Sequence, residues 1–461
     1  MTRAKNVRTM EEIPLSKIHI QMFLYNGGGA FIDGYILGII AVALAILQPQ
    51  FDMSLTMVGL IGTATLAGMF LGGTLFGYIT DKIGRKKMFI LDLIVFIIAS
   101  VLQLFVTDPI QLLILRFILG VAVGADYPIA SSLMAEFSPR KNRGTLLGGL
   151  VALWYVGYGI SYLVGYLMLP LGDSNWRWML ASSAVPALIV LLARVNMPES
   201  PRWLASKGKL DEANDIIKKL FGENVVLSDE PENNVKTSYK DIFRNGYGKW
   251  TIFIALFWTL QVAPSFAIAT YIPQVLGKFG LADGSSEYLG SAVISIFYVC
   301  GLIPAIYLVE KVGRRPVLVW PFLISALVLF VLGATSGAHL SFAFTITLFI
   351  IYGIFHNGME ILQWIYPNEL FPTSIRATAT GFGAGFSRVG ASISTFIFPI
   401  VLDKYGLEST LYMCAALFFI GFLISLWMAP ETKNMSLAET SALNKRSNKL
   451  SSKPKSGTKI I

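Results

Sequence analysis

The chain has 461 residues, of which 54% are hydrophobic and only 14% are charged, with a mean hydropathy of +0.62. Soluble domains contain roughly 25% charged residues, and a soluble protein would have no means of covering so much apolar sequence. The composition therefore excludes a soluble multidomain protein and predicts an all-α membrane protein.

Apolar segments of membrane-spanning length recur along the chain. A spanning helix needs about 20 mostly apolar residues, and about twelve such segments can be placed. We therefore expect twelve transmembrane helices in two pseudo-symmetric six-helix bundles, at 18–197 and 251–429. Residues 1–17 and 430–461 are predicted to be tails, and 198–250 a linker. The predicted spans are 18–47, 57–79, 88–107, 109–135, 144–170 and 176–197, then 251–277, 287–310, 316–335, 341–366, 376–402 and 408–429.

The basic residues alternate between loops. With 37 basic and 28 acidic residues, the net charge is +9, which taken alone could suggest a nucleic-acid partner. However, lysine and arginine gather in every second loop, which is the positive-inside pattern of membrane proteins. The pattern predicts a multi-pass protein of the plasma membrane with both termini cytoplasmic, surrounded by lipids and without a nucleic-acid partner. The loops contain Lys82, Arg85, Lys86 and Lys87, then Arg140, Lys141 and Arg143, then Lys311, Arg314 and Arg315.

The polar segment between the two sets of spans begins with a helical pattern. Its apolar residues predict an amphipathic helix on the cytoplasmic face, followed by a flexible linker at 221–247. Cys300 and Cys414 fall inside spans and offer no disulfide framework or metal motif, so no cofactor or metal is expected. The apolar residues at helical spacing are Leu204, Leu210, Ala213, Ile216, Ile217 and Leu220.

Two sequence motifs occur in both halves. "DKIGRKK" (81–87) matches "EKVGRRP" (310–316), with an acid, two residues, glycine and then basic residues. "EFSPRKNRG" (136–144) matches "ELFPTSIRA" (369–377), with glutamate, proline and arginine at the same spacing. The two pairs have nearly the same offset, which indicates gene duplication and a pseudo-two-fold axis normal to the membrane.

With these motifs, nearly the whole chain resembles the major facilitator superfamily. "PESPRWL" (198–204) and "PETK" (430–433) are similar to sugar porters, and "GADYPIASSLMAEFSP" (124–139) to phosphate and metabolite:proton symporters. "FSRVGAS" (386–392) resembles organic-ion and metabolite transporters. The resemblance implies secondary active transport by alternating access, with a central cavity between two six-helix halves.

Acids and bases recur at the helix ends that carry the repeated motifs. Alternating access needs contacts that form in one state and break in another, and partly buried ion pairs can bias such an equilibrium. We predict that these charges form cytoplasmic gates; the alternative is that they only set the topology. The candidates are Asp81, Arg85, Glu136, Arg143, Glu199 and Arg202, and in the second half Glu310, Arg314, Arg315, Glu369, Arg376 and Glu431.

Two aspartates lie deep in predicted spans, Asp33 in the first and Asp126 in the fourth. Ionisable residues within a membrane are usually functional, so both are candidate proton-coupling residues; alternatively, Asp33 only hydrogen-bonds a neighbouring helix. Arg116 matches the arginine that pairs with the first-span acid of proton-coupled sugar porters, although Ile36 replaces that acid here. The resemblance thus implies a pair between Asp33 and Arg116. Asp92, near the start of the third span, is expected beside the loop basic residues.

Arg388 is the residue most informative about the substrate. An arginine in the eleventh span offers a planar fork to a carboxylate and makes a cavity attractive to anions; alternatively, it pairs internally with Glu360 or an aspartate. His356 and Glu360 lie one turn apart on the same helix face. The remaining candidate substrate-binding residues are polar or aromatic and lie in spans: Gln261, Asn357, Gln363, Trp154, Tyr158, Tyr271 and Trp364.

The sequence therefore predicts a carrier that uses protons to move a small polar metabolite and acts as a monomer. An organic anion, such as a carboxylate or sugar acid, is favoured, with a sugar or polyol as the alternative. A third possibility is a nutrient sensor on the same fold that transports nothing. The Gly-rich stretches follow no strand and precede no Walker lysine, so ATP-driven transport and enzymatic activity are not expected.

Overall fold

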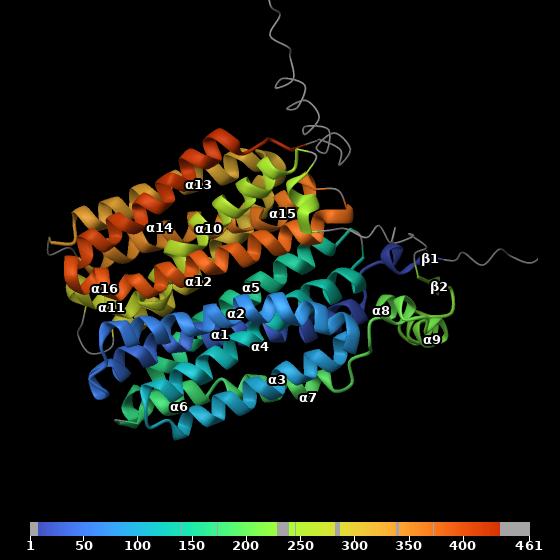
Figure 1. Ribbon diagram of the computed structural model, residues 1–461, viewed down its shortest axis with the longest axis horizontal. Helices are drawn as coiled ribbons and strands as arrows, with labels where there is room; N and C mark the ends of the chain where they lie inside the picture. Colours follow the sequence, from blue (N-terminus) through green and yellow to red (C-terminus); the bar gives the residue numbers. More distant parts are fainter. Residues whose placement is uncertain are drawn as a thin grey trace, which may run out of the picture.

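The computed structural model describes residues 8–139, 141–172, 174–227, 239–244, 246–281, 286–337, 341–371 and 373–433. Nearly all of this chain is helical (Figure 1). Parts of the predicted tails, at 1–7 and 434–461, and of the predicted linker, at 228–238, lie outside the described residues. The expectation of an all-α membrane protein is confirmed.

The N-terminal half begins with five long helices and ends in a pass made of two shorter ones. Asp108 starts one of the long helices: its Oδ1 accepts a hydrogen bond from the Ile110 amide, and Pro109 occupies the first helical position. A 3₁₀ turn, η2 (Gln103–Phe105), precedes it. The helices are α1 (Lys17–Gln50), α2 (Leu55–Ile83), α3 (Arg85–Leu102), α4 (Pro109–Phe137), α5 (Arg143–Met168), α6 (Asn175–Ala181) and α7 (Ala184–Arg194), with η3 (Leu169–Leu171) after α5.

The C-terminal half contains a helix of 56 residues, α16 (Thr373–Met428). At Gly406 its backbone turns to φ +79°, so α16 comprises two membrane passes. Eleven stretches of the described chain are long and apolar enough to cross a membrane, and α16 counts once among them, which gives twelve passes. The other elements are η4 (Tyr239–Phe243), α10 (Gly248–Thr270), α11 (Ile272–Leu276), the π-helical η5 (Gly277–Leu281), α12 (Ser286–Lys311), α13 (Arg314–Ala334), α14 (Phe342–Glu360) and α15 (Leu362–Leu370).

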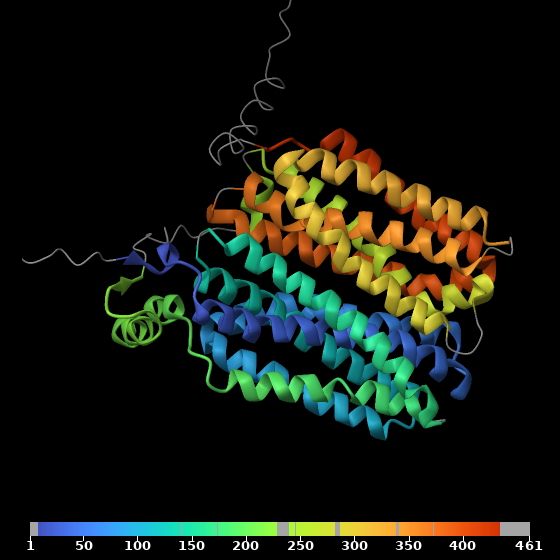
Figure 2. The ribbon, with the colours of Figure 1, turned by 180° about the vertical axis from the view of Figure 1, so that it is seen from behind.

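The two halves lie side by side as two bundles. Figures 1 and 2 show α1 to α7 in blue and green and α10 to α16 in yellow to red, with their helices running in the same general direction. α2 packs against α16, and α5 against α12, across the contact between the halves. Large apolar side chains such as Leu192, Ile303 and Trp427 remain exposed, as expected where lipid replaces water as the solvent.

Two short helices lie beyond one end of the bundle, which we call the linker end: α8 (Pro201–Ser206) and α9 (Leu210–Phe221) (Figure 1). α9 turns the buried Ala213 and Ile217 inwards, and Ile217 shares a hydrophobic cluster with Met10, whereas Leu210 stays exposed. The N-terminal β1 (Arg8–Thr9), followed by η1 (Met10–Glu12), pairs in parallel with β2 (Val225–Val226). The N-terminus therefore helps to hold α9 against the first half.

The segment predicted to be a flexible linker is partly folded. β2 falls within it, and so does η4, where Ile242 is fully buried. The Ile242 carbonyl accepts a hydrogen bond of 2.5 Å from Thr251 Oγ1 in α10. An apolar side chain and its carbonyl thus fix the chain immediately before the second half.

Candidate functional site

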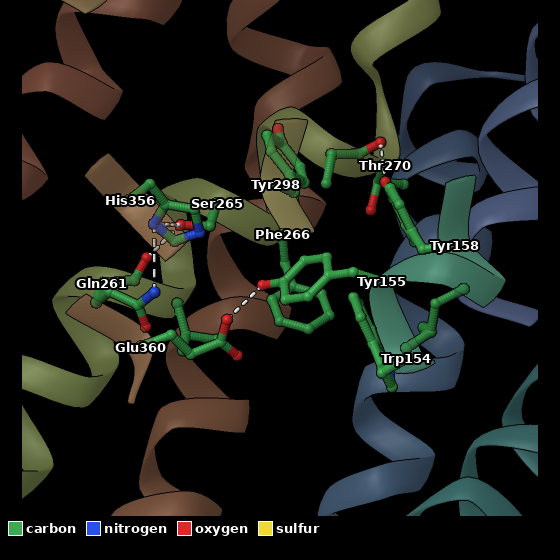
Figure 3. A pocket seen from close by; sticks show the side chains of 13 residues that line it. Trp154, Tyr155, Tyr158, Gln261, Ser265, Phe266, Thr270, Tyr298, His356 and Glu360 are labelled. Carbon is green, nitrogen blue, oxygen red and sulfur yellow. Dashed lines mark hydrogen bonds between the residues drawn. The ribbon is translucent and has the colours of Figure 1, made fainter. Parts of the chain in front are cut away.

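A small cavity lies between the two halves. Its walls come from α1 and α5 on one side and from α10, α12 and α14 on the other (Figure 3). Its volume is about 40 Å³, well below the roughly 300–1,000 Å³ of pockets that hold small molecules. The helices must therefore separate before a metabolite can enter. The lining residues are Leu37, Trp154, Tyr155, Tyr158, Gln261, Val262, Ser265, Phe266, Ala269, Thr270, Tyr298, His356 and Glu360.

Neutral polar groups of the C-terminal half form a network on one wall. Nε2 of Gln261 lies 3.2 Å from Nδ1 of His356, and Ser265 Oγ lies 3.3 Å from the same nitrogen. Gln363, on α15, donates to Oε1 of Gln261. The His356 ring stacks on Tyr352, with ring centroids 5.4 Å apart. Three predicted residues, Gln261, His356 and Gln363, thus meet in one amide and imidazole network.

Aromatic rings form the opposite wall. Trp154 and Tyr158, one turn apart on α5, stack with their planes 7° apart, and Phe266 meets Trp154 edge to face. The hydroxyls of Tyr158 and Tyr162 both donate to the carbonyl of Ala269 on α10, each at 2.8 Å. This wall combines flat apolar faces with hydroxyls that bind the other half.

Two side chains also meet across the cavity between the halves: Tyr155 on α5 donates a hydrogen bond to the Glu360 carboxylate on α14 (Figure 3). Arg388 of α16 lies with its guanidinium 5.4 Å from the centre of the Phe266 ring, within electrostatic range of Glu360. Arg388 is not among the described residues that line the cavity. The structure thus places Arg388 beside Phe266 and near Glu360, both of its own half.

Gln363 reaches the cavity only through Gln261, and three other predicted substrate residues also lie outside the cavity lining. Asn357 is fully buried, and neither its Oδ1 nor its Nδ2 has a hydrogen-bond partner among the described residues. Trp364 packs edge to face on Trp258. Tyr271 donates to the Val58 carbonyl of α2 at 3.3 Å, so it joins the halves rather than facing the cavity.

A cluster of buried charges lies inside the N-terminal half. Asp126 on α4 pairs with Arg194, the last residue of α7, with Nη1 3.2 Å from Oδ1. Asp33 and Asp92 lie within electrostatic range of both. The exposed fractions are 0% for Asp33, 4% for Asp92 and 1% for both Asp126 and Arg194. We call these four residues the aspartate cluster.

Arg194 is fixed by several neighbours. Its Nε donates to the Tyr25 carbonyl at 2.8 Å, and Nη1 donates to the Phe89 carbonyl at 3.3 Å. The guanidinium also lies 3.5 Å from the centre of the Phe89 ring. A side chain at Gly29 would collide with it, because an added Cβ would lie 2.3 Å from Arg194 Nη2 and 2.4 Å from Asp126 Oδ2.

The pair of Asp33 with Arg116 is not formed. Arg116 Nη2 donates instead to the Ile36 carbonyl at 3.0 Å, and neither oxygen of Asp33 has a hydrogen-bond partner in the described chain. In α4, Arg116 and Asp126 are about 15 Å apart along the axis, and it is Asp126 that lies near Asp33. The expectation for Asp92 is also wrong, because Asp92 joins this buried cluster and does not lie beside the basic residues of the loop.

The charged motif of the N-terminal half forms a contact at the linker end. Arg85 pairs with Glu136, and Ser200 donates to the other oxygen of Glu136. Glu199 accepts hydrogen bonds of 3.1 Å from the amides of Arg85 and Lys86, the first residues of α3. A helix N-terminus favours negative charge. Glu199, in the segment that follows α7, therefore caps the N-terminus of α3 with its side chain.

The C-terminal half repeats this arrangement. Arg314 Nη2 lies 2.9 Å from Oε1 of Glu369 and 3.1 Å from Oε1 of Glu310. Thr432 donates to the other oxygen of Glu369. Glu431 accepts from the amides of Arg314 and Arg315 at 3.0 and 3.1 Å, at the start of α13. The two halves therefore share one pattern of ion pair, hydroxyl and helix cap.

The other predicted gate residues are placed less fully. Arg143 begins α5 and Arg202 lies in α8, and both have partners of their own. The side chains of Asp81 and Arg376 lie outside what the structure describes, although their helices, α2 and α16, are described.

Sequence reasoning missed Arg194, Tyr155, Ser265, Phe266 and Tyr298. Arg194 stands near the end of an apolar run, where an arginine can reach the membrane surface, so its burial gives no local signal. The other four residues are of types that are common in spans, and only the fold shows which of them face the cavity.

Two six-helix halves around a cavity, with matching ion pairs at one end, define a membrane transporter. The family described as "Sugar (and other) transporter" matches residues 22–443, and the chain belongs to this family of the major facilitator superfamily. It is a transporter rather than an enzyme.

Known relatives and structures agree with this assignment. The chain is 42% identical over 443 residues to YaaU of Escherichia coli K12, a candidate metabolite transport protein, covering 96% of this chain and 99% of YaaU. It is 36% identical to the inner membrane metabolite transport protein YgcS of the same organism, over 93% of this chain and 95% of YgcS. The partially occluded, inward-open structure of the Escherichia coli xylose transporter XylE superposes with a TM-score of 0.78 at 22% identity, covering 91% of this chain and all of XylE.

Proposed function

We propose that the protein is a proton-coupled symporter for a small neutral polyhydroxylated metabolite, a sugar or a polyol. The observation that supports this most is the cavity between the halves, which is lined by stacked aromatic rings and neutral amide, imidazole and hydroxyl groups. Rings pack against the apolar faces of a sugar ring, and neutral polar groups hydrogen-bond its hydroxyls. Among the relatives is the arabinose-proton symporter of Bacillus subtilis, 27% identical over 95% of this chain.

The same cavity weakens the preference for an organic anion. The ionisable acid on its wall is Glu360, whose carboxylate would repel a substrate carboxylate. Arg388 remains the reason to keep an anion as the second candidate, because its guanidinium lies over Phe266, which does line the cavity. Rotation of Arg388 past Phe266 would be needed for it to reach an anion.

For the coupling to protons, α1 supplies a direct mechanical path. Asp33 belongs to the aspartate cluster, and Leu37, one turn further along α1, lines the cavity. Between them, Gly34 packs against the backbone of Trp154, so that a Cβ there would lie 1.9 Å from the Trp154 carbonyl oxygen. A change of charge at Asp33 that tilts α1 would therefore move Leu37 and Trp154, which lie on the wall of the cavity that the N-terminal half supplies.

For alternating access, the paired contacts at the linker end provide the gate. Each half holds its own helices together there through Arg85 with Glu136, or through Arg314 with Glu369. These pairs are partly buried, so they are worth more than exposed pairs but remain breakable. We assign the linker end to the cytoplasm from the positive-inside pattern, and the protein to the plasma membrane.

Uptake into proteoliposomes tests this proposal. Purified full-length protein should accumulate a labelled sugar or polyol when the lumen is alkaline, and a protonophore should abolish accumulation while exchange of labelled for unlabelled substrate continues. Sugars, polyols and carboxylates are first screened by thermal shift. Accumulation without a proton gradient would overturn the coupling, and binding without any flux would identify a sensor.

Arg388→Ala separates the two substrate classes. If the substrate is a sugar, the variant should bind it within a few-fold of the unaltered protein, because Arg388 does not line the cavity. Loss of binding of a carboxylate that the unaltered protein binds would instead favour the organic anion.

A further inference from the structure

Asp92 has no assigned role in the transport scheme above, yet it belongs to the buried aspartate cluster. It stands on α3 about 10 Å from the start of that helix, one turn after Phe89, whose ring and carbonyl contact Arg194. Asp92 lies within electrostatic range of Asp126 and Arg194 and is 4% exposed. Its Oδ1 accepts a hydrogen bond from the adjacent Leu93 amide, and its Oδ2 has no partner among the described residues.

The charges of the cluster do not balance when all its members are ionised. Three carboxyl groups, of Asp33, Asp92 and Asp126, share the single guanidinium of Arg194. Two uncompensated negative charges in a dry interior would cost far more than the protonation of two carboxyl groups. The count therefore gives a neutral cluster only when it carries two protons.

Among the described residues, the other basic side chains of the helices around the cluster lie in first or last turns or bind elsewhere, and those of α3 (Arg85, Lys86 and Lys87) stand in its first turn. In α4 the other charged groups are Arg116, which binds the Ile36 carbonyl, and Glu136, which binds Arg85. In α6, Arg177 donates to the Val106 carbonyl. In the sequence of α2, charge occurs only at Asp81 and Lys82, in its last turn. On α1, Lys17, His19, Tyr25 and Tyr35 are the other titratable residues, and Tyr35 bonds Ser182.

Unpartnered atoms also converge on the cluster. Both oxygens of Asp33, Oδ2 of Asp126 and Nη2 of Arg194 are buried without a hydrogen-bond partner among the described residues. Gly29, one turn before Asp33 on α1, lies against the latter two atoms. Protons bound by the carboxyl groups would supply hydrogen-bond donors to these oxygens, whereas Arg194 Nη2 already carries hydrogens that a carboxyl oxygen can accept.

We propose that Asp33, Asp92 and Asp126 form one proton-binding site around Arg194 that holds two exchangeable protons, with Asp92 as its third carboxyl group. Each proton converts a carboxylate into a carboxyl group, and each leaves again as a proton when the cluster opens to water at one end. This inference rests on the proposed function, and it adds a second proton to the transport cycle.

Infrared spectroscopy of the purified full-length protein, titrated with acid and base alone, counts these protons. The carbonyl stretch of protonated buried carboxyl groups should show two equivalents at neutral pH, which disappear on alkaline titration. Asp92→Asn should show one. Asp108→Asn is the matched control, because it makes the same change at the far end of α4, where asparagine caps a helix as well as aspartate, and it should show two.

One equivalent or none in the unaltered protein, or an unchanged signal in Asp92→Asn, would overturn the inference. If Asp92→Asn does not fold, the count in the unaltered protein and in Asp33→Asn still decides. Two carboxyl equivalents in a protein that transports no substrate would contradict the proposed function but not the proton site. Proton-driven uptake by a protein with only one carboxyl equivalent would contradict the second proton but not the proposed function.

Discussion

Asp126 and Arg194 form a buried ion pair that joins α4 to the end of α7, with 3.2 Å between Oδ1 and Nη1. The pair lies where the chain leaves the first half, five residues before Glu199 caps α3. The buried charge cluster and the capped ion-pair contact at the linker end are therefore connected through one short segment of backbone.

Arg194→Leu should strongly destabilise the protein. Removing one partner of a buried pair leaves a charge without compensation and costs about 3–5 kcal/mol. The double variant Arg194→Leu with Asp126→Asn should recover part of the loss, because the stranded carboxylate is gone. Thermal unfolding of the detergent-purified protein measures both. Equal losses in the single and double variants would show that Arg194 acts only through Phe89 and the backbone carbonyls.

Neutralising the gate acids should slow transport to a similar degree in both halves. Glu136→Gln and Glu369→Gln each remove a partly buried ion pair with arginine, so we expect uptake to fall several-fold while substrate binding persists. The comparison is between initial uptake rate and equilibrium binding.

Glu212→Gln is the control for these two variants. Glu212 pairs with Lys209 on the exposed face near α9, at 58% exposure, where an ion pair is worth about 0–1 kcal/mol. Uptake by this variant should be unchanged. A slowing as large as that of Glu136→Gln would mean that loss of any linker-end charge slows transport, and the gate interpretation would fail.

Two glycines should resist substitution for more than one reason. Gly84 and Gly313 adopt φ of +111° and +117° at the starts of α3 and α13, and an added Cβ would lie 2.8 Å and 2.4 Å from carboxylate oxygens of Glu199 and Glu431. Alanine should therefore strain the backbone and also displace the capping carboxylate.

A substitution at Gly208 distinguishes the backbone strain from the displacement of the capping carboxylate. This glycine has φ +77° with nothing within 4 Å of an added Cβ, so Gly208→Ala should cost only the strain of about 1–2 kcal/mol. Thermal unfolding should rank Gly84→Ala and Gly313→Ala below Gly208→Ala. Equal stability of all three variants would show that the two glutamates do not need their present positions.

The sequence predicts the fold and the repeated contacts well, and the aspartate cluster poorly. The residues of the linker-end ion pairs could be predicted as a set because duplication left the same acid and base at the same spacing, so Glu136 and Glu369 each identify the other. The neighbours of Asp33 could not be found in this way. They depend on how far α4 slides along α1, because Arg116 and Asp126 stand about 15 Å apart on α4 and it is Asp126, with Arg194, that lies near Asp33.

The cavity shows a second limit of sequence reasoning. Gln261 and His356 were found because polar groups are rare in spans, yet Tyr271 and Trp364 have the same signal and lie outside the lining. Which face of a helix meets the other half depends on packing. Arg388 illustrates the same point. Its residue type favours an anion-binding site, whereas in the structure its guanidinium packs over the Phe266 ring of the same half.

Gly34→Ala should abolish coupled transport by separating α1 from α5. At Gly34 a Cβ would lie 1.9 Å from the Trp154 carbonyl oxygen, which no rotamer can relieve because the backbone fixes the position of Cβ and the oxygen is itself a backbone atom. The helices must move apart, and with them Leu37 and the Trp154 ring that line the cavity. Gly144→Ala, on α5 with nothing within 4 Å of the added Cβ, should leave uptake intact and gain up to about 1 kcal/mol in helix propensity. Uptake and thermal unfolding of the two variants are compared side by side. Proton-driven uptake by Gly34→Ala at the level of Gly144→Ala would show that α1 does not carry the signal from Asp33 to the cavity.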